Sequence, residues 1–159
     1  MRFQFYKIIS AKSKFIWLVN SVWFYALATI FGSIVTPQRM KRILIIEDDL
    51  LISSLVQFRL KKDGYETLLA QDGNAGIDAI NTEYLDMIIT DVMIPYKNGI
   101  EIIHHARNTK PEIPIIVLSS LGEEEKIVLE AFNLGVSDFI PKPFNPNELA
   151  IRVKRIFKS

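Results

Sequence analysis

The sequence predicts an α/β fold in which five parallel strands form a doubly wound sheet, and three observations support this. Short apolar runs alternate with amphipathic stretches through residues 40–159, which is typical of βαβ units. The runs are rich in β-branched residues and mostly apolar, as expected of strands covered on both faces. These 120 residues are also enough to bury a core without disulfides or a structural metal.

The expected strands are short, and each is followed by a stretch with helical spacing of apolar residues. The strands are Ile43–Ile46, Glu66–Ala70, Met87–Thr90, Ile113–Leu118 and Asp138–Ile140. The helices are Leu50–Lys62, Ala75–Glu83, Gly99–Asn108, Glu123–Leu134 and Pro146–Phe157.

Two of these helices have clear end signals. Gly64 follows the first helix at the position where a C-terminal cap belongs. The last helix begins with Asn145 as its expected cap, Pro146 at the first position and Glu148 in the first turn. Asp49 is a further cap candidate, for the first helix.

Charge divides the chain near Met40. All 18 acidic residues follow position 40, whereas the first 39 residues hold five basic residues and no acidic one. The two parts therefore carry formal charges of +5 and −4. The acidic balance of residues 40–159 argues against a DNA-binding surface there. The absence of cysteine excludes thiolate metal sites and redox chemistry.

Polar residues gather where the expected strands end. Glu47 and Asp48 follow the first strand, Asp91 the third, Ser119 the fourth and Lys142 the fifth. Functional residues of open parallel sheets meet at the carboxyl ends of the strands. Carboxylates that lie close together raise one another's pKa values unless a cation neutralises them. Oxygen ligands favour Mg²⁺ over zinc, so a magnesium site is expected at this edge.

Four motifs give a specific family resemblance. IIEDD, MIITDVMIPYKNG, PIIVLSS and SDFIPKPF have the order and spacing found in bacterial response-regulator receiver domains of the chemotaxis-regulator type, which residues 40–159 resemble over nearly their whole length. The resemblance implies a flavodoxin-like fold with strand order 2-1-3-4-5. Pro141 agrees with that order, because proline is best tolerated on an edge strand.

The resemblance also implies a role for each residue at the strand ends. Asp91 would be the phosphoacceptor, attacking a phosphohistidine or a small phosphodonor. Asp48, Asp91 and the backbone carbonyl of Met93 would bind Mg²⁺, and Glu47 would act through water. Lys142 and Mg²⁺ would offset the charge of the phosphoryl group in transfer.

Two further residues are expected to form a switch. By the resemblance, Ser119 would hydrogen-bond the phosphoryl group and Phe139 would turn into the space that Ser119 leaves. This would change the face formed by the helix at 123–134, the strand at 138–140 and the helix at 146–157. His104 and His105 lie on an expected helix away from the strand ends, and both are expected at the surface.

The predicted function is that of a single-domain response regulator in a two-component phosphorelay. It would catalyse its own phosphorylation without being an enzyme for an external substrate. Its expected partners are a sensor histidine kinase or histidine phosphotransfer protein and a downstream output protein, with no direct nucleic-acid binding and with phosphorylation-dependent homodimers as an option.

Other functions stay open or are disfavoured. The alternative is the receiver part of a winged-helix transcriptional regulator, because NPNELAIRVKRIF resembles the last receiver helix of that group, with Glu148 and Arg152 at positions used for dimerisation. A phosphotransferase or phosphatase of similar topology is disfavoured, since that class usually has an acid where Met93 stands. The cognate kinase, the signal and the output partner do not follow from the sequence.

Residues 1–39 are expected to form a separate hydrophobic N-terminal segment with three interpretations. Residues 15–35 carry no charge and are long enough for a helix that tethers a cytoplasmic receiver to a membrane. Basic residues on both sides leave the orientation open. The second interpretation is a secretory signal with a site at Ala26–Ala28, which export away from cytoplasmic phosphodonors disfavours. The third is a mis-assigned start codon, with translation beginning at Met40.

Overall fold

The computed structural model describes residues 39–120 and 125–158. The chain divides into two units, Met1–Arg39 and Met40–Ser159, and the described residues fall almost entirely in the second. The predictions for residues 1–39, including a hydrophobic helix, therefore lie outside the described residues. In the ranges that are described, no helix has both the length and the apolar character needed to cross a membrane.

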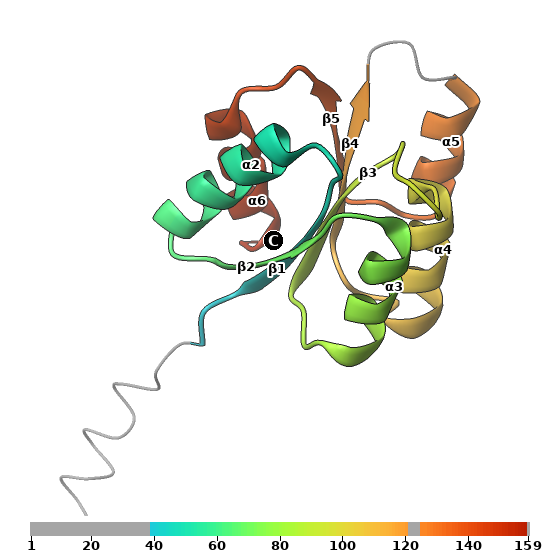
Figure 1. The fold of residues 1–159 in the computed structure, drawn as a ribbon, viewed down its shortest axis with the longest axis horizontal. Coiled ribbons are helices and arrows are strands. Elements are labelled where there is room, and N and C mark those ends of the chain that lie inside the picture. The colour runs from blue at the N-terminus through green and yellow to red at the C-terminus, as the bar shows by residue number, and fades with distance from the viewer. Residues whose placement is uncertain (1–38, 121–124, 159) are drawn as a thin grey trace, which may run out of the picture. The chain divides into compact units, whose positions relative to one another are not determined.

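Five parallel strands form one sheet in the order β2-β1-β3-β4-β5 (Figure 1). The flavodoxin-like fold class and the strand order predicted from the sequence are confirmed. The strands are β1 Arg42–Ile46, β2 Glu66–Ala70, β3 Met87–Asp91, β4 Ile115–Ser120 and β5 Asp138–Lys142.

Four strands have boundaries that differ from the prediction by one or two residues, and proline is involved in two of these differences. β4 begins at Ile115 rather than Ile113, directly after Pro114, which has no N–H to donate to a ladder. β5 continues through Pro141 to Lys142, because β5 is an edge strand and the missing N–H of Pro141 costs no pairing there.

Five helices cover the sheet, with α2 and α6 on one face and α3, α4 and α5 on the other (Figure 1). Asp49 and Asn145 cap α2 and α6 as predicted. α3 begins two residues before the predicted start, because the Asp72 side chain accepts a hydrogen bond from the Ala75 amide and caps an earlier turn. The helices are α2 Leu50–Lys62, α3 Gly73–Thr82, α4 Gly99–Thr109, α5 Glu125–Asn133 and α6 Pro146–Ile156.

The sheet divides the core into two layers. Alternate residues of β1 point to opposite faces, so that Leu44 and Ile46 pack with α3, α4 and α5, whereas Ile43 and Ile45 pack with α2 and α6. All four are fully buried. This packing on both faces fixes the strands whose carboxyl ends carry the predicted site residues.

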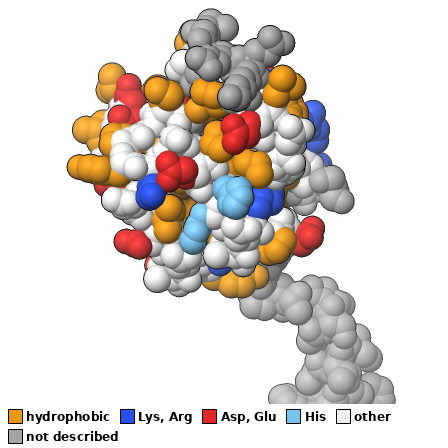
Figure 2. Space-filling view, turned by 90° about the vertical axis from the view of Figure 1, so that its right-hand side faces the viewer, with side chains coloured by type: hydrophobic (Ala, Val, Ile, Leu, Met, Phe, Trp, Pro, Cys, Tyr) orange, Lys and Arg blue, Asp and Glu red, His pale blue; other side chains and the backbone are white. Residues whose placement is uncertain are grey.

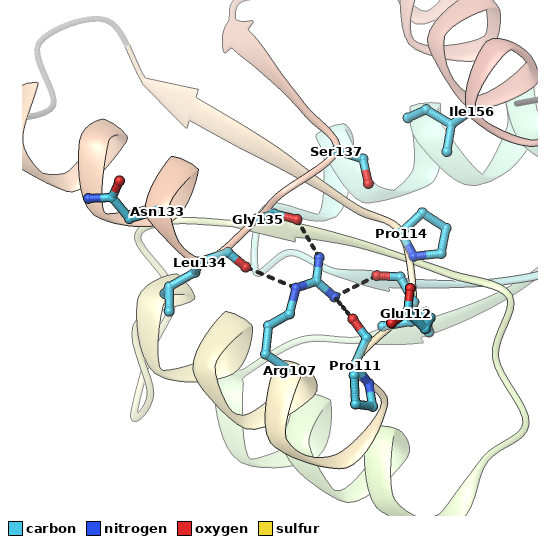
Figure 3. A pocket seen from close by; sticks show the side chains of 10 residues that line it. Arg107, Pro111, Glu112, Pro114, Asn133, Leu134, Gly135, Ser137 and Ile156 are labelled. Carbon is cyan, nitrogen blue, oxygen red and sulfur yellow. Dashed lines mark hydrogen bonds between the residues drawn. The ribbon is translucent and has the colours of Figure 1, made fainter.

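The Arg107 side chain of α4 joins neighbouring backbone segments at the amino edge of the sheet (Figure 3). The Arg107 guanidinium donates hydrogen bonds to the carbonyl oxygens of Leu134 and Gly135, at 2.9 and 2.7 Å. It also donates to the carbonyls of Pro111 and Ile113, at 3.1 and 2.7 Å. Burial lowers the pKa of Arg107. The carbonyls at the end of α5, which have no partner within that helix, are thereby satisfied.

Candidate functional site

The carboxyl edge of the sheet brings together a lysine and two carboxylates from three strands. The Lys142 ammonium at the end of β5 donates to Glu47 Oε2 and to Asp91 Oδ2, each at 2.7 Å. Glu47 directly follows β1 and is 1% exposed, and Asp91 ends β3 and is 5% exposed. The Lys142 side chain is 13% exposed, so the three side chains form a largely buried, charged triad.

Burial and charge oppose each other in this triad. Burial raises the pKa of Glu47, and the hydrogen bond and charge of Lys142 offset only part of that effect. Burial alone would lower the pKa of Lys142, but its hydrogen bonds to Asp91 and Glu47 outweigh it, so the pKa of Lys142 is raised. Lys142 is thus a charged donor shared between two carboxyl groups.

The backbone around Asp91 is fixed by close packing. The Met93 amide donates to Asp91 Oδ1 at 3.3 Å, and the Gly99 amide donates to the Val92 carbonyl at 2.8 Å. A Cβ atom at Gly99 would lie 2.5 Å from the Asp91 carbonyl oxygen and 2.7 Å from the Val92 Cα. Only glycine therefore lets α4 begin this close to the end of β3. This role of Gly99 was not predicted from the sequence, although the glycine lies only eight residues after Asp91.

Three carboxylates at this edge form a group that suits a metal ion. Glu47, Asp48 and Asp91 each place one oxygen within 4.8 Å of the others. Asp48 is exposed and the other two are buried. With Lys142 as the cation of the triad, the four side chains carry a formal charge of −2. A hard divalent cation with oxygen ligands fits both the charge and the donor set.

The two predicted switch residues lie on adjacent strands, Ser119 on β4 and Phe139 on β5. Ser119 pairs in register with Pro141, and Phe139 pairs with Val117, so Ser119 and Phe139 belong to the same face of the sheet. The Phe139 ring is half-buried and stacks on Phe132 of α5 at 4.8 Å between ring centroids. The aromatic side chain of β5 is therefore in contact with α5 itself.

The remaining predicted residues lie outside the triad. The Met93 side chain is 64% exposed, and only its backbone takes part in the geometry around Asp91. Figure 2, viewed from the side of α3, α4 and α5, shows both histidines of the chain at the surface. His104 is exposed and hydrogen-bonded to Asn108, and neither histidine belongs to the metal-suited group found among the described residues.

Comparisons with known proteins agree with this geometry. Residues 43–154 match the family model of the response regulator receiver domain. The alkaline phosphatase synthesis transcriptional regulatory protein PhoP of Bacillus subtilis (strain 168) is 38% identical over 118 residues, which is 74% of this chain and 49% of that protein. The chain therefore spans about half the length of this relative.

Solved structures give the same result. A CheY-like receiver domain protein from Methanospirillum hungatei JF-1 has a TM-score of 0.72 at 27% identity, covering 75% of this chain and 94% of that one. The receiver domain of the Francisella response regulator 1452 has a TM-score of 0.68 at 32% identity, covering 74% and 97%. These two chains hold little beyond the matched region.

Proposed function

The chain belongs to the response regulator receiver domain family, and we propose from this that Asp91 is its phosphoacceptor in a two-component phosphorelay. The observation that carries the proposal is the triad: a buried aspartate at the end of β3 whose carboxylate is bonded to Lys142 at 2.7 Å. A nucleophile held beside a fixed cation is suited to attack an electron-rich phosphoryl group.

In the proposed reaction, a carboxylate oxygen of Asp91 forms a bond to phosphorus while the bond from phosphorus to the donor nitrogen breaks. The donor histidine leaves with a proton, and Asp91 becomes an aspartyl phosphate. Lys142 holds the Asp91 carboxylate in place and stabilises the phosphoryl oxygens. Glu47 keeps Lys142 oriented from the opposite side, at 2.7 Å.

A magnesium ion fits the oxygen ligands at this edge. Asp48, Asp91 and the backbone carbonyl of Met93 would hold it, with Glu47 acting through water, because Mg²⁺ is usually held by one or two carboxylates and keeps several waters. When bound, Mg²⁺ neutralises carboxylate charge and polarises the phosphoryl group. The formal charge of −2 on the four side chains supports this assignment, since one divalent cation balances it.

The proposed output runs through the face of α5, β5 and α6. Ser119 donates to the phosphoryl group once Asp91 carries it, and Phe139 turns toward the space that Ser119 leaves. The stacking of Phe139 on Phe132 at 4.8 Å supports the coupling, because rotation of the Phe139 ring removes a contact of α5. The signal thus reaches a surface that an output protein contacts.

The proposed partners are a sensor histidine kinase or histidine phosphotransfer protein and a downstream output protein. The chain acts on no external substrate and binds no nucleic acid itself. It works in the cytoplasm, tethered to a membrane through residues 15–35. The intact mass of the protein made from its native gene tests the tether: translation from Met40 alone would eliminate it.

The test of Asp91 is direct. The full chain is incubated with Mg²⁺ and acetyl phosphate, and the intact mass is measured beside that of Asp91→Ala and of a control, Asp78→Ala, at an exposed aspartate of α3. The wild-type protein and the control are expected to gain one acid-labile phosphoryl group and Asp91→Ala none. Failure of the wild-type protein to gain it would refute the proposal.

A second candidate is the receiver part of a transcriptional regulator that acts as a dimer. It is favoured by the relative in Bacillus subtilis, a transcriptional regulatory protein of which the match covers only about half. In this chain, Arg152 donates to Glu148 Oε1 at 2.6 Å and to Asp138 Oδ1 at 3.0 Å, so dimerisation through Arg152 would exchange these partners. A downstream frame encoding a DNA-binding domain would favour this candidate, and a monomeric phosphorylated chain would count against it.

A further inference from the structure

Four exposed lysines gather at the amino edge of the sheet, where α2 and α6 end. These two helices lie side by side on one face (Figure 1). Among the described residues, none of the four lysines forms an ion pair. We call this group the basic end surface; it consists of Lys61, Lys62, Lys154 and Lys158.

Contacts between the two helix ends bring these lysines together. Lys154 lines a hollow with Arg59, Asp63 and Tyr65, the last of which lies three residues after Lys62. The Tyr65 ring lies 5.5 Å from the ring of Phe157, the residue before Lys158. One aromatic contact thus joins the end of α2 to the end of α6.

The acidic side chains around this surface are already paired. Each forms an ion pair with a base other than the four lysines, at 2.9 to 3.2 Å: Asp63 with Arg59, Glu66 with Arg42, and Asp86 with Lys41. The charge of the basic end surface is therefore left uncompensated locally, although residues 40–159 carry a net charge of −4.

The helix dipole does not account for this distribution. A base near the C-terminus stabilises any helix, yet α3 and α5 have no base in their last turn. α4 has one, Arg107, whereas α2 has Arg59, Lys61 and Lys62 and α6 has Lys154 and Arg155. The surplus belongs to the α2–α6 face and suits an anionic partner in contact with that face.

The edge at which the chain enters the domain indicates the kind of partner that this surface contacts. Residues 1–38 join the domain at this same edge, where β1 begins at Arg42, and residues 15–35 carry no charged side chain. Residues 36–41 span at most ~20 Å when extended. Two exposed apolar side chains lie at the same end: Phe58, one turn before Lys62, is 69% exposed, and Met40 is 60% exposed. Basic and apolar side chains in one surface are typical of lipid interfaces.

We propose that the basic end surface lies against an anionic lipid bilayer and turns the Asp91 crevice toward solvent. The proposal rests on the proposed tether through residues 15–35. Each lysine near an anionic leaflet strengthens the attraction about fivefold. The Asp91 crevice lies at the opposite, carboxyl edge of the sheet and carries the surplus carboxylates, so the same membrane repels it. The active site would thus stay open to phosphodonors.

The absence of cysteine makes a direct test possible. A fluorescent label is attached to Phe58→Cys or, as its matched control, to Leu51→Cys, which is 82% exposed and ~10 Å away along α2. The full chain is reconstituted into vesicles of phosphatidylcholine, with or without 30% phosphatidylserine, that contain a headgroup spin label. Quenching at residue 58 is expected to exceed that at residue 51 at least twofold, in the anionic vesicles only.

Charge variants separate the surface from the rest of the domain. Lys61→Gln with Lys62→Gln is expected to remove at least half of the quenching at residue 58. Gln71→Glu with Asn74→Asp, at exposed positions between β2 and the first turn of α3, changes the net charge equally at the carboxyl edge and is expected to leave the quenching unchanged. A salt concentration of 0.5 M should also reduce the quenching at residue 58, as the Lys61 and Lys62 substitutions do. At this concentration the screening length between exposed charges is only a few ångströms.

Flotation of the same vesicles distinguishes the two proposals. If the chain floats with neutral and anionic vesicles but residues 58 and 51 are quenched equally, the basic end surface is refuted and the tether stands. If it floats with neither, both proposals are refuted. If both charge variants reduce quenching equally, net charge rather than this surface is responsible, and the proposal is also refuted.

Discussion

The two edges of the sheet use charge in opposite ways. At the carboxyl edge, the buried carboxyl groups of Glu47 and Asp91 share the partly buried Lys142, with both lysine contacts at 2.7 Å. At the amino edge, Arg107 is occupied by four backbone carbonyls, and the lysines of the basic end surface are exposed. Charged residues thus form the proposed reaction site at one edge. At the other edge, Arg107 binds backbone carbonyls and the lysines form an exposed surface.

Burial explains the difference. A buried ion pair gains from its partners but suffers a large loss if one of them is removed, because an uncompensated charge is left behind. Substitution of an exposed lysine changes the free energy of unfolding very little, since water already solvates its ammonium group in the folded protein. The carboxyl edge should therefore be sensitive to single substitutions and to divalent cations, and the amino edge to the loss of backbone anchors.

Removal of Lys142 should have the largest effect. Lys142→Met leaves Glu47 and Asp91 facing each other without a cation and is expected to lower the free energy of unfolding by about 3 kcal/mol. Because Mg²⁺ can neutralise the same carboxylates, at least a third of the loss should return in 10 mM Mg²⁺. Urea unfolding with and without Mg²⁺ measures both quantities.

The control for Lys142 comes from the other edge. Lys154→Met removes an exposed, unpaired lysine of α6 and is expected to change stability by less than about 0.5 kcal/mol, with no response to Mg²⁺. Equal losses in the two lysine variants would show that burial does not distinguish the edges.

A methyl group at Gly99 should have the next largest effect. Gly99→Ala places a Cβ atom 2.5 Å from the Asp91 carbonyl oxygen, and backbone atoms cannot yield as a flexible side chain can. A loss of about 2 to 3 kcal/mol is expected, together with slower phosphorylation of Asp91. Chemical unfolding and the rate of phosphorylation by acetyl phosphate measure the two effects.

Gly64 is the matched glycine at the amino edge. It has φ +88°, with open space where a Cβ would lie, so Gly64→Ala suffers only the strain of a left-handed backbone, about 1 kcal/mol. Its phosphorylation rate should equal that of the wild-type protein. A slower rate in Gly64→Ala would mean that stability, rather than the position of Asp91, limits the reaction.

Substitution of Arg107 tests whether the amino edge is structural only. Arg107→Gln leaves several carbonyls without a donor and is expected to cost about 2 kcal/mol. Arg107→Lys should recover less than half of this, because an ammonium cannot reproduce the planar fork of donors. Both variants should still be fully phosphorylated on Asp91. A wild-type unfolding midpoint in Arg107→Gln would contradict the assigned role.

Local patterns in the sequence were sufficient to predict the strands and the side chains at the carboxyl edge, whereas the order of the strands followed from the family resemblance. Apolar periodicity places β1 and β3, and strand ends in a parallel sheet converge by topology, so Glu47 and Asp91 were predicted near Lys142. The sequence did not reveal that Lys142 is shared between them. Lys142 lies 51 positions from Asp91 and 95 positions from Glu47, so no local pattern joins the three residues.

Arg107 and Gly99 were missed for a different reason. Arg107 lies in the last turn of an amphipathic helix, where a base usually interacts with the helix dipole or with water, and its carbonyl partners come from loops whose placement no periodicity encodes. Gly99 has an ordinary φ, so no turn signal marks it, and its requirement comes only from the close approach of α4 to the backbone of β3. Both roles are tertiary.

The smallest expected effect is a pH dependence at the amino edge. Burial, and to a lesser degree the charge of Asp63, raises the pKa of Tyr65, so the folded protein holds the phenolic proton more tightly than the unfolded chain does. Stability contributed by this proton is present below the tyrosine pKa of the unfolded chain and declines as the pH rises above it. Tyr65→Phe, which keeps the ring on Phe157, should therefore lose less stability than the wild-type protein above pH 10, by about 1 °C in Tm. Tyr96→Phe, at a 79% exposed side chain near the carboxyl edge, should follow the wild-type curve, and a parallel shift in both variants would show that burial at the amino edge does not set this dependence.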